Sequence, residues 1–399
     1  MINPKTNERE LVYVAKVEEI QPIEGYDRVE YARIGAGWWV VVRKEQFKPG
    51  DLAIYFEVDS KVPEKEPFMF LEPKHFKIKT QRMCKRISQG LLMSFDDFNW
   101  NSGDYKEGQF LTEKLGVTYS VSEDNTRKSN VDKYTKMYMK HRKLFKNKFL
   151  KWVYSKNFGK RVLFVFLGKS KKKRNDWPEW VKKTDEERIQ NMPWMFPGDG
   201  KEWIATEKID GSSCTFTVKG FGRKRIFKVC SRNVCFDTET PKKCYYDDLG
   251  EGNIYIEMAN KYSAKEVMGN MLDHYRTIYP DIEWLTIQGE VYGGNIQKRK
   301  YCDYHDLAVF NIIKGFKDGH TERYNPIEGY KVAVEHGFKY VPIVDRHFKI
   351  PETCEQILEI AGGISEIDGG MREGIVCRSY DGERSFKVVD NEFLLKYHN

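Results

Sequence analysis

Short apolar segments separated by turn residues fill the first 115 residues of the chain. Four of them follow one another at regular spacing, with Gly or Pro turns between them, at residues 11–20, 27–34, 38–45 and 52–58. A fifth candidate strand spans Ile87 to Phe95. Short strands at regular spacing with such turns are typical of small β-barrels. We therefore expect a barrel domain over residues 1–115.

Two adjacent tryptophans, Trp38 and Trp39, begin the third of these segments. Together with Arg43 and Lys44 they could stack on and clamp a nucleic-acid strand. Side chains alternate between the two faces of a strand, however, so one tryptophan would pack inside the barrel while the other covers its outside. The sequence leaves both interpretations open.

The hydrophobic pattern changes to a helical one between about residues 130 and 155. Apolar and aromatic residues recur there at steps of three and four, and lysines and arginines fill the opposite face. A basic amphipathic helix of this kind can lie on nucleic acid or on a membrane surface, and its aromatic stripe can equally be core packing. Because Gly and Ser are sparse, we expect residues 116–200 to form a basic, structured connector and not a flexible tether.

The positive charge of the chain is concentrated in this connector. Residues 125–175 contain 18 Lys or Arg and one acid, Asp132, which leaves the remainder of the chain about nine charges negative although the whole chain carries +8. A charge run can be no more than a solvated face. A bias this strong indicates a polyanionic partner.

Other features exclude several classes of protein. No stretch approaches the roughly 20 apolar residues of a membrane helix, and the first residues lack the apolar segment of a secretion signal. We therefore expect a monomeric, soluble protein of the cytoplasm, or of the host cytoplasm if the source is a virus, without disulfides. Cys230, Cys235 and Cys244 are close in sequence, but their spacing does not match a zinc site, and ordinary strand cysteines are the simpler interpretation.

The chemistry is indicated by the string WIATEKIDGSS, residues 203–213, in which an apolar strand ends at Lys208 and is followed by Asp210 and Gly211. It resembles the K-x-D-G nucleophile motif of the covalent nucleotidyltransferases, which include DNA ligases, RNA ligases and mRNA-capping enzymes. Alone, such a short match is weak. Further segments resemble the downstream motifs of that superfamily in the right order: Ser231-Arg232-Asn233, residues 288–293, residues 307–310, residues 373–376 and residues 385–388.

The resemblance implies a set of functional residues. The catalytic residues would be Lys208, Asp210, Glu290, Glu373 and Lys387. ATP would be bound by Glu207, Lys208, Arg232, Glu290, Phe310 and Lys387, with Phe310 stacked on adenine. A divalent cation, Mg²⁺ or Mn²⁺, would be held by Asp210, Glu290 and Glu373, since carboxylates suit hard cations. An amine is a nucleophile only when neutral, so we expect burial and the neighbouring Lys387 to lower the pKa of Lys208.

Three sequence features distinguish RNA ligases from the other members of the superfamily. DNA ligases typically carry arginine five positions after the nucleophile, where this chain has Ser213. DNA ligases and capping enzymes place an OB domain after the last motif, yet only 12 residues follow Lys387. An OB-like module in front of the transferase domain, together with WVKKTDEERIQNMP at residues 180–193, resembles the RNA ligases of the Naegleria and Deinococcus type.

The chain also departs from that pattern. Related ligases often have a second lysine two positions after the first in the last motif, where this chain has Val389. Lys396 or a cation of the connector could substitute for it. The connector is also longer and more basic than expected for the group.

Taken together, the sequence predicts an α+β protein with an OB-like β-barrel at residues 1–115, a basic helical connector at 116–200 and a nucleotidyltransferase domain of antiparallel sheets with flanking helices at 201–399. The resemblance implies an ATP-dependent RNA ligase that joins 3′-hydroxyl and 5′-phosphate RNA ends through a lysyl-AMP intermediate in RNA repair. A nicked duplex is one candidate substrate. The alternatives are a DNA-joining or GTP-using enzyme and a non-catalytic nucleic-acid-binding protein.

Overall fold

The computed structural model describes residues 1–119 and 177–397 apart from residues 4, 5, 7, 36, 184 and 237–251, together with residues 152–154, 156 and 160. Most of the helix expected at 130–155 lies outside the described residues. Residues 1–118 and 176–399 pack into one compact unit. No helix in the described part of the chain is both long and apolar enough to span a membrane.

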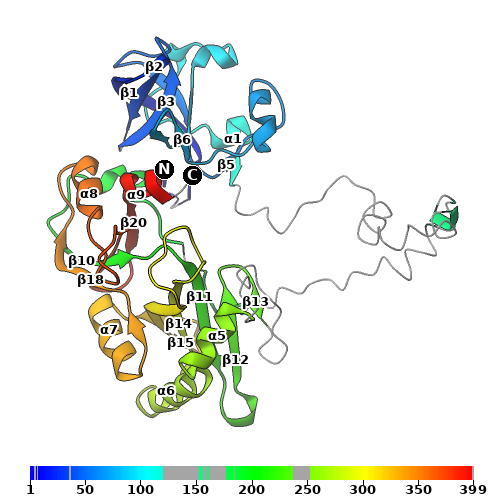
Figure 1. The fold of residues 1–399 in the computed structure, drawn as a ribbon, viewed down its shortest axis with the longest axis vertical. Coiled ribbons are helices and arrows are strands. Elements are labelled where there is room, and N and C mark those ends of the chain that lie inside the picture. Colours follow the sequence, from blue (N-terminus) through cyan, green and yellow to red (C-terminus); the bar gives the residue numbers. More distant parts are fainter. Residues whose placement is uncertain are drawn as a thin grey trace. The chain divides into compact units, whose positions relative to one another are not determined.

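The N-terminal region is a curled antiparallel sheet, drawn in blue in Figure 1. Its strand order is β3-β2-β1-β4-β8, with bounds β1 Val12–Ile23, β2 Tyr26–Ile34, β3 Trp38–Arg43, β4 Leu52–Phe56 and β8 Leu91–Met93. The Gln89 N–H donates to the Trp39 carbonyl over 2.9 Å, which connects β3 back to the segment before β8. Smaller elements complete the region: β5 Ser60–Lys61, β6 Gln81–Met83, β7 Arg86–Ser88, β9 Thr118–Tyr119, α1 Thr112–Leu115 and 3-10 helices at Met69–Lys74, Phe95–Phe98 and Ser102–Asp104. The OB-like barrel predicted from the sequence is confirmed.

Alternation along β3 places the two tryptophans on opposite faces of the sheet. Trp38 is buried in the core of the barrel together with Val40 and Val42. Trp39 is half-buried, and its ring stacks on that of Tyr31 with centroids 4.5 Å apart. The inside-and-outside interpretation of this pair is therefore correct.

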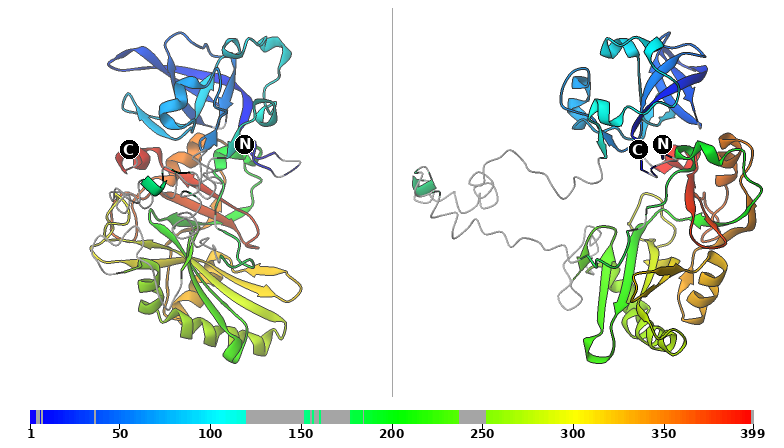
Figure 2. Two further views of the ribbon diagram at one scale, coloured as in Figure 1. Left: turned by 90° about the vertical axis from the view of Figure 1, so that its right-hand side faces the viewer. Right: turned by 180° about the vertical axis from the view of Figure 1, so that it is seen from behind.

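The C-terminal region contains two sheets, which Figure 2 shows from two sides. One has the order β18-β10-β19-β20, and the other β13-β12-β11-β14-β15-β16 with β17 added in parallel to β15. The bounds of the first are β10 Glu202–Lys208, β18 Ile343–Lys349, β19 Gly374–Ser379 and β20 Ser385–Val389. Those of the second are β11 Ser212–Lys219, β12 Ile226–Ser231, β13 Cys235–Phe236, β14 Ile282–Tyr292, β15 Asp306–Phe316, β16 Thr321–Arg323 and β17 Lys339–Tyr340. Apart from the β15–β17 pair, the sheets are antiparallel as predicted.

Helices flank these sheets: α5 Ile254–Lys261, α6 Ala264–Ile278, α7 Pro326–Glu335, α8 Cys354–Ala361 and α9 Asn391–Tyr397. α6 lies along β11 and β14, as Figure 1 shows. Three of the helices are capped at their N-termini by side chains that accept backbone N–H groups. These side chains are Asn253 for α5, Asn325 for α7 and Thr353 for α8. Short 3-10 helices occur at Ile189–Asn191, Pro193–Met195 and Gly222–Lys224.

The segment that leads into β10 packs against the C-terminal sheets. Ile189 is fully buried in the core cluster that contains Trp203 and Phe386, and the Trp180 indole donates to the Thr217 hydroxyl over 3.1 Å. The Arg188 backbone also pairs in parallel with that of Lys387. The residues before β10 thus form part of the frame of the last strand.

Two of the three neighbouring cysteines lie in the part of the chain that the structure describes. Cys230 and Cys235 face each other across the β12–β13 hairpin, and Cys244 lies outside the described residues. In the part of the chain that the structure describes, no group of three or more His, Cys, Asp or Glu side chains is placed to hold a metal ion.

Candidate active site

Lys208 is the last residue of β10, where the two sheets approach each other. It pairs with Gly374 at the start of β19, and the chain then turns at Asp210-Gly211 into β11. Its side chain is 24% exposed and lines a cavity of about 270 Å³ together with Glu207, Glu290, Phe310, Arg232 and Lys387. The structure therefore brings the residues predicted to bind the nucleotide into one cavity.

The Lys208 ammonium contacts the carboxylate of Glu373, the residue just before β19. Nζ lies 2.7 Å from both carboxylate oxygens. Burial alone would lower the pKa of Lys208, but the negative charges of Glu373 and Glu290 outweigh it, so the net shift of this pKa is upward. The expectation that burial and Lys387 would give Lys208 a lowered pKa is therefore wrong for this arrangement, because the neighbouring carboxylates outweigh burial.

Negative charge accumulates around the amine. Burial raises the pKa of Glu290 to about 8, Lys208 opposes this shift, and the nearby carboxylates of Glu373 and Asp210 add to it. Asp210 is also buried, and its backbone N–H donates to the Tyr301 hydroxyl over 3.0 Å. Like charges this close, in a partly buried place, are costly unless a cation joins them. The three carboxylates are hard oxygen donors, so their chemistry suits Mg²⁺ or Mn²⁺, although in this structure the described side chains are not gathered into a group of metal ligands.

Gly211 gives this turn its close packing. A Cβ atom at Gly211 would overlap the Val291 carbonyl and lie 2.9 Å from the Glu290 Cγ. The carbonyl of Gly211 accepts the Gln297 side-chain amide over 2.9 Å. The absence of a side chain at this position therefore lets the turn that carries Asp210 pack directly against β14, which carries Glu290.

Phe310 reaches the cavity because of a bulge in β15. Gln288 pairs with Asn311, but the next residue, Gly289, pairs with Val309, so Phe310 is the extra residue. A bulge of this kind re-aims a side chain. Gly289 permits it, since a Cβ there would lie 2.6 Å from the Ala308 carbonyl.

On the other side of the cavity, two cations share one acid. The Asp185 carboxylate lies 2.9 Å from an Arg232 nitrogen and 3.3 Å from Lys387 Nζ. Burial lowers the pKa of Lys387, Asp185 opposes this shift, and Arg188 and Lys208 add to it. Glu207 is buried, and its carboxylate accepts the Glu366 backbone N–H over 3.0 Å.

Three charged residues of this cavity were missed by the sequence analysis. They are Asp185, Glu186 and Arg378. Arg378 is almost fully buried, donates to Glu186 over 3.0 Å and lies 5.8 Å from the centre of the Phe310 ring. The acidic pair within the lead-in string and the arginine just after EGIVC were visible signals, but nothing local connects them to the cavity.

A second cavity, of about 500 Å³, lies on the other side of Lys208. Lys208, Glu373 and Lys387 line it together with Asp59 and Lys79 of the N-terminal region, and with Arg188, Lys298 and Val389. Lys396, which the sequence suggested as a substitute for the missing lysine, is exposed and does not line this cavity in the described part of the chain. Among the described residues, the cations that line this cavity with Val389, besides Lys208 and Lys387, are Lys79, Arg188 and Lys298.

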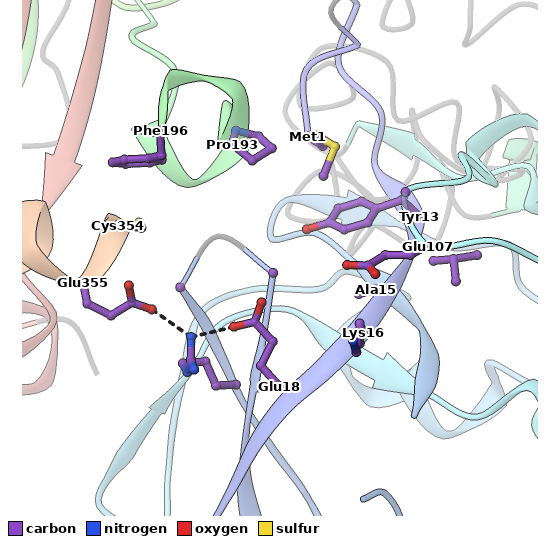
Figure 3. A pocket seen from close by; sticks show the side chains of 15 residues that line it. Met1, Tyr13, Ala15, Lys16, Glu18, Glu107, Pro193, Phe196, Cys354 and Glu355 are labelled. Carbon is purple, nitrogen blue, oxygen red and sulfur yellow. Dashed lines mark hydrogen bonds and ion pairs between the residues drawn. The ribbon is translucent and has the colours of Figure 1, made fainter. Parts of the chain in front are cut away.

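A third cavity, of about 430 Å³, contains none of the predicted catalytic residues. Figure 3 shows that it is lined by strand residues such as Lys16 and Glu18 of the N-terminal region and by Cys354 and Glu355 at the start of α8. The Arg33 guanidinium contacts Glu355 over 3.0 Å, and Glu18 as well. These contacts hold the barrel to the C-terminal region and carry no reactive group.

Two antiparallel sheets that meet at a strand-end lysine, with carboxylates around the amine and an aromatic and cationic cavity beside it, define a covalent nucleotidyltransferase. A model of the RNA ligase family matches residues 201–397. A second model, described as an OB-fold domain, matches residues 11–95. The chain belongs to the RNA ligase family and carries an N-terminal OB-fold module.

Solved structures of an RNA ligase from Naegleria gruberi are similar to the chain over nearly its whole length. An apo variant of that enzyme has a TM-score of 0.64 and 25% identity, covering 97% of this chain and 98% of the other. A variant with ATP and Mn has a TM-score of 0.63 and 26% identity, covering 97% and 99%. A variant with AMP and Mn has a TM-score of 0.63 and 25% identity, covering 98% and 99%. No curated protein sequence matches the chain.

Proposed function

We propose that this protein is an ATP-dependent RNA ligase that joins 3′-hydroxyl and 5′-phosphate RNA ends through a lysyl-AMP intermediate, and that it serves RNA repair. The observation that carries the proposal is the position of Lys208, whose amine lies between a carboxylate cluster and a cavity lined by Phe310, Arg232 and Lys387. The similar Naegleria gruberi enzyme was solved with ATP and Mn, which supports ATP as the nucleotide.

In the first step the neutral amine of Lys208 attacks the α-phosphorus of ATP. An N–P bond forms, the bond from that phosphorus to the bridging oxygen breaks, and pyrophosphate leaves. Lys208 must first give up a proton that Glu373, 2.7 Å away, now stabilises. The carboxylate of Glu373 or Glu290 is the nearest group to accept it.

The remaining residues bind and orient the nucleotide. Phe310 offers a ring face for adenine, and Lys387 and Arg232 present cations to the α-phosphate in place of Asp185. Asp210, Glu290 and Glu373 would hold a divalent cation. When bound, that cation supplies positive charge where negative charge develops on the phosphoryl oxygens.

The later steps use the same residues on a polynucleotide. The 5′-phosphate oxygen of the RNA attacks the AMP phosphorus, the N–P bond breaks, and the amine of Lys208 is regenerated. The 3′-hydroxyl then attacks the 5′-phosphorus of the adenylylated end, which forms the phosphodiester and releases AMP.

The test is covalent labelling with ATP that carries the label on its α-phosphate. The wild-type protein should form an adduct that is acid-labile and alkali-stable, as expected of a phosphoramidate, and Lys208→Ala should form none. Lys219→Ala is the matched control, because Lys219 also ends a strand but pairs with Glu283 away from the cavity. Undiminished labelling of Lys208→Ala would refute the mechanism.

The substrate class is tested with nicked duplexes that carry RNA or DNA independently on the 3′-hydroxyl and 5′-phosphate strands. We expect sealing only when RNA supplies the ends. Efficient sealing of an all-DNA nick would show a DNA ligase, and labelling by GTP but not ATP would show a different nucleotide. A folded protein that takes no label would be a non-catalytic nucleic-acid-binding protein.

A further inference from the structure

The N-terminal OB-fold region carries a second concentration of positive charge, separate from the connector. Residues 74–88, here called the cationic segment, contain six Lys or Arg and no Asp or Glu. They are Lys74, Lys77, Lys79, Arg82, Lys85 and Arg86. The segment includes the hairpin of β6 and β7.

Most of these cations lie on the surface. All six except Lys77 are exposed. Within the residues that the structure describes, no carboxylate lies within ion-pair distance of Lys79, Lys85 or Arg86. Unpaired like charges on adjacent strands repel each other, so the segment carries an electrostatic cost that an anion would relieve.

The cationic segment is held firmly beside the catalytic residues. Ile87 packs in one buried cluster with Val389 and Leu394, and the Arg82 guanidinium donates to the Leu395 carbonyl over 3.4 Å. Lys79 lines the same cavity as Lys208 and Lys387. Its charges therefore have a fixed position relative to the reacting amine.

The apolar side chain of Val389 accounts for the position of the cationic segment. Related ligases often have a lysine where this chain has Val389, and here that side chain is used to anchor Ile87 of the cationic segment. Position 389 therefore carries no positive charge in this chain, and the adjacent β6–β7 hairpin supplies several positively charged side chains instead.

The two tryptophans of the barrel are not available for the same task. Trp38 is in the core, and Trp39 stacks on Tyr31, over which Arg86 also lies at 5.8 Å. These two rings therefore provide no free stacking platform, and the cationic segment contributes to binding through its charge.

We propose that the cationic segment binds the phosphodiester backbone of the RNA strand whose end enters the active site. This inference rests on the proposed ligase function. It assigns strand binding to residues 74–88 and not to the face formed by Trp39, Arg43 and Lys44. Because phosphate contacts carry no sequence information, the binding should be independent of sequence.

The test compares two triple variants of the full-length protein. One is Lys74→Gln with Lys85→Gln and Arg86→Gln. Its matched control is Arg43→Gln with Lys44→Gln and Lys48→Gln, which removes three exposed cations from the β3–β4 side of the same region. Lys79 is left intact because it lines the cavity of Lys208. Melting temperatures confirm that both variants fold, and Lys85→Gln alone replaces the triple variant if it does not fold.

The measurements are the affinity for a 5′-phosphorylated RNA oligonucleotide at several salt concentrations, the rate of lysyl-AMP formation and the rate of nick sealing. Each lost phosphate contact removes about 0.7 to 0.9 from the log–log salt slope, so three contacts should lower the slope by about 2 to 3. The single variant should lower it by about 1. Lysyl-AMP should form at the wild-type rate in all variants, and the control should keep its salt slope.

An unchanged slope in the cationic-segment variant, or an equal fall in the control, would overturn the inference. Slower lysyl-AMP formation in that variant would also overturn it, because the segment would then act on ATP. Failure of the wild-type protein to form lysyl-AMP is a different result and refutes the proposed function itself.

Discussion

Gly211 leaves no room for a side chain, and Gly211→Ala should therefore stop the first chemical step without unfolding the protein. The added Cβ would overlap the Val291 carbonyl and lie 2.9 Å from the Glu290 Cγ, whereas real Cβ atoms essentially never approach closer than 3.0 Å. The turn and β14 must then separate by roughly 1 Å, a displacement that can cost about 100-fold in rate at a reacting centre. Both Asp210 and Glu290 move with that separation.

The assay is the single-turnover rate of lysyl-AMP formation, with the melting temperature measured in parallel. We expect a rate loss of about 100-fold and a loss of about 1 to 3 kcal/mol in the free energy of unfolding from overpacking. Gly103→Ala is the control, because the nearest atom to its Cβ would be at 3.5 Å. A folded Gly211→Ala protein that reacts at the wild-type rate would show that the positions of these carboxylates are not critical.

Two further predictions concern charges around the site and in the core. Asp185→Asn should tighten ATP binding by up to about fivefold at low salt. The Asp185 carboxylate now forms exposed ion pairs with Lys387 and Arg232, worth at most ~1 kcal/mol, and it competes with the phosphates of ATP for these cations. Weaker binding in a titration with ATP would instead make Asp185 a residue that positions those cations. Asp306→Asn should lower the free energy of unfolding at neutral pH by about 2 kcal/mol. The buried Asp306 carboxylate accepts hydrogen bonds from the ammonium groups of Lys339, over 2.6 Å, and Lys261, over 2.9 Å, and both lysines are themselves partly exposed. Burial raises the pKa of Asp306, but these hydrogen bonds outweigh it, so the net shift of this pKa is downward. The contribution of Asp306 to the free energy of unfolding is therefore present above the unfolded-state pKa of about 3.9 and is lost as the pH falls toward the pKa of the folded protein. Equal melting temperatures of the two proteins at pH 7 would contradict this prediction.

The strands of the OB-fold region could be predicted because alternation and turns are local signals. The expected strand at Ile87–Phe95 is instead two strands, β7 and β8, divided at Gln89-Gly90. Gly90 has a φ of 94°, and the ring of Tyr55 lies where a Cβ atom at Gly90 would be. That close approach is a tertiary contact, which no pattern within the segment could indicate.

At the site, the sequence indicated residues of the motif segments, and the structure places those expected to bind the nucleotide around one cavity, while Asp210 and Glu373 line the second cavity, which shares Lys208. It could not indicate Asp185 or Arg378, whose contacts with Lys387 and Glu186 cross about 200 residues of chain. It also could not show that Phe310 faces the cavity through a bulge. Bulges depend on the register of two strands that are paired only in the folded protein.

The contact between Ile87 and Val389 has a consequence for the evolution of the protein. A lysine at 389 would have to place its charge against an isoleucine, and a polar residue at 87 would face a valine. The two positions lie in regions that are described as separate modules, yet neither can change its polarity alone. An OB-fold module transplanted from a relative that keeps the second lysine would therefore meet the wrong surface, and the two modules of this ligase are exchangeable only as a pair.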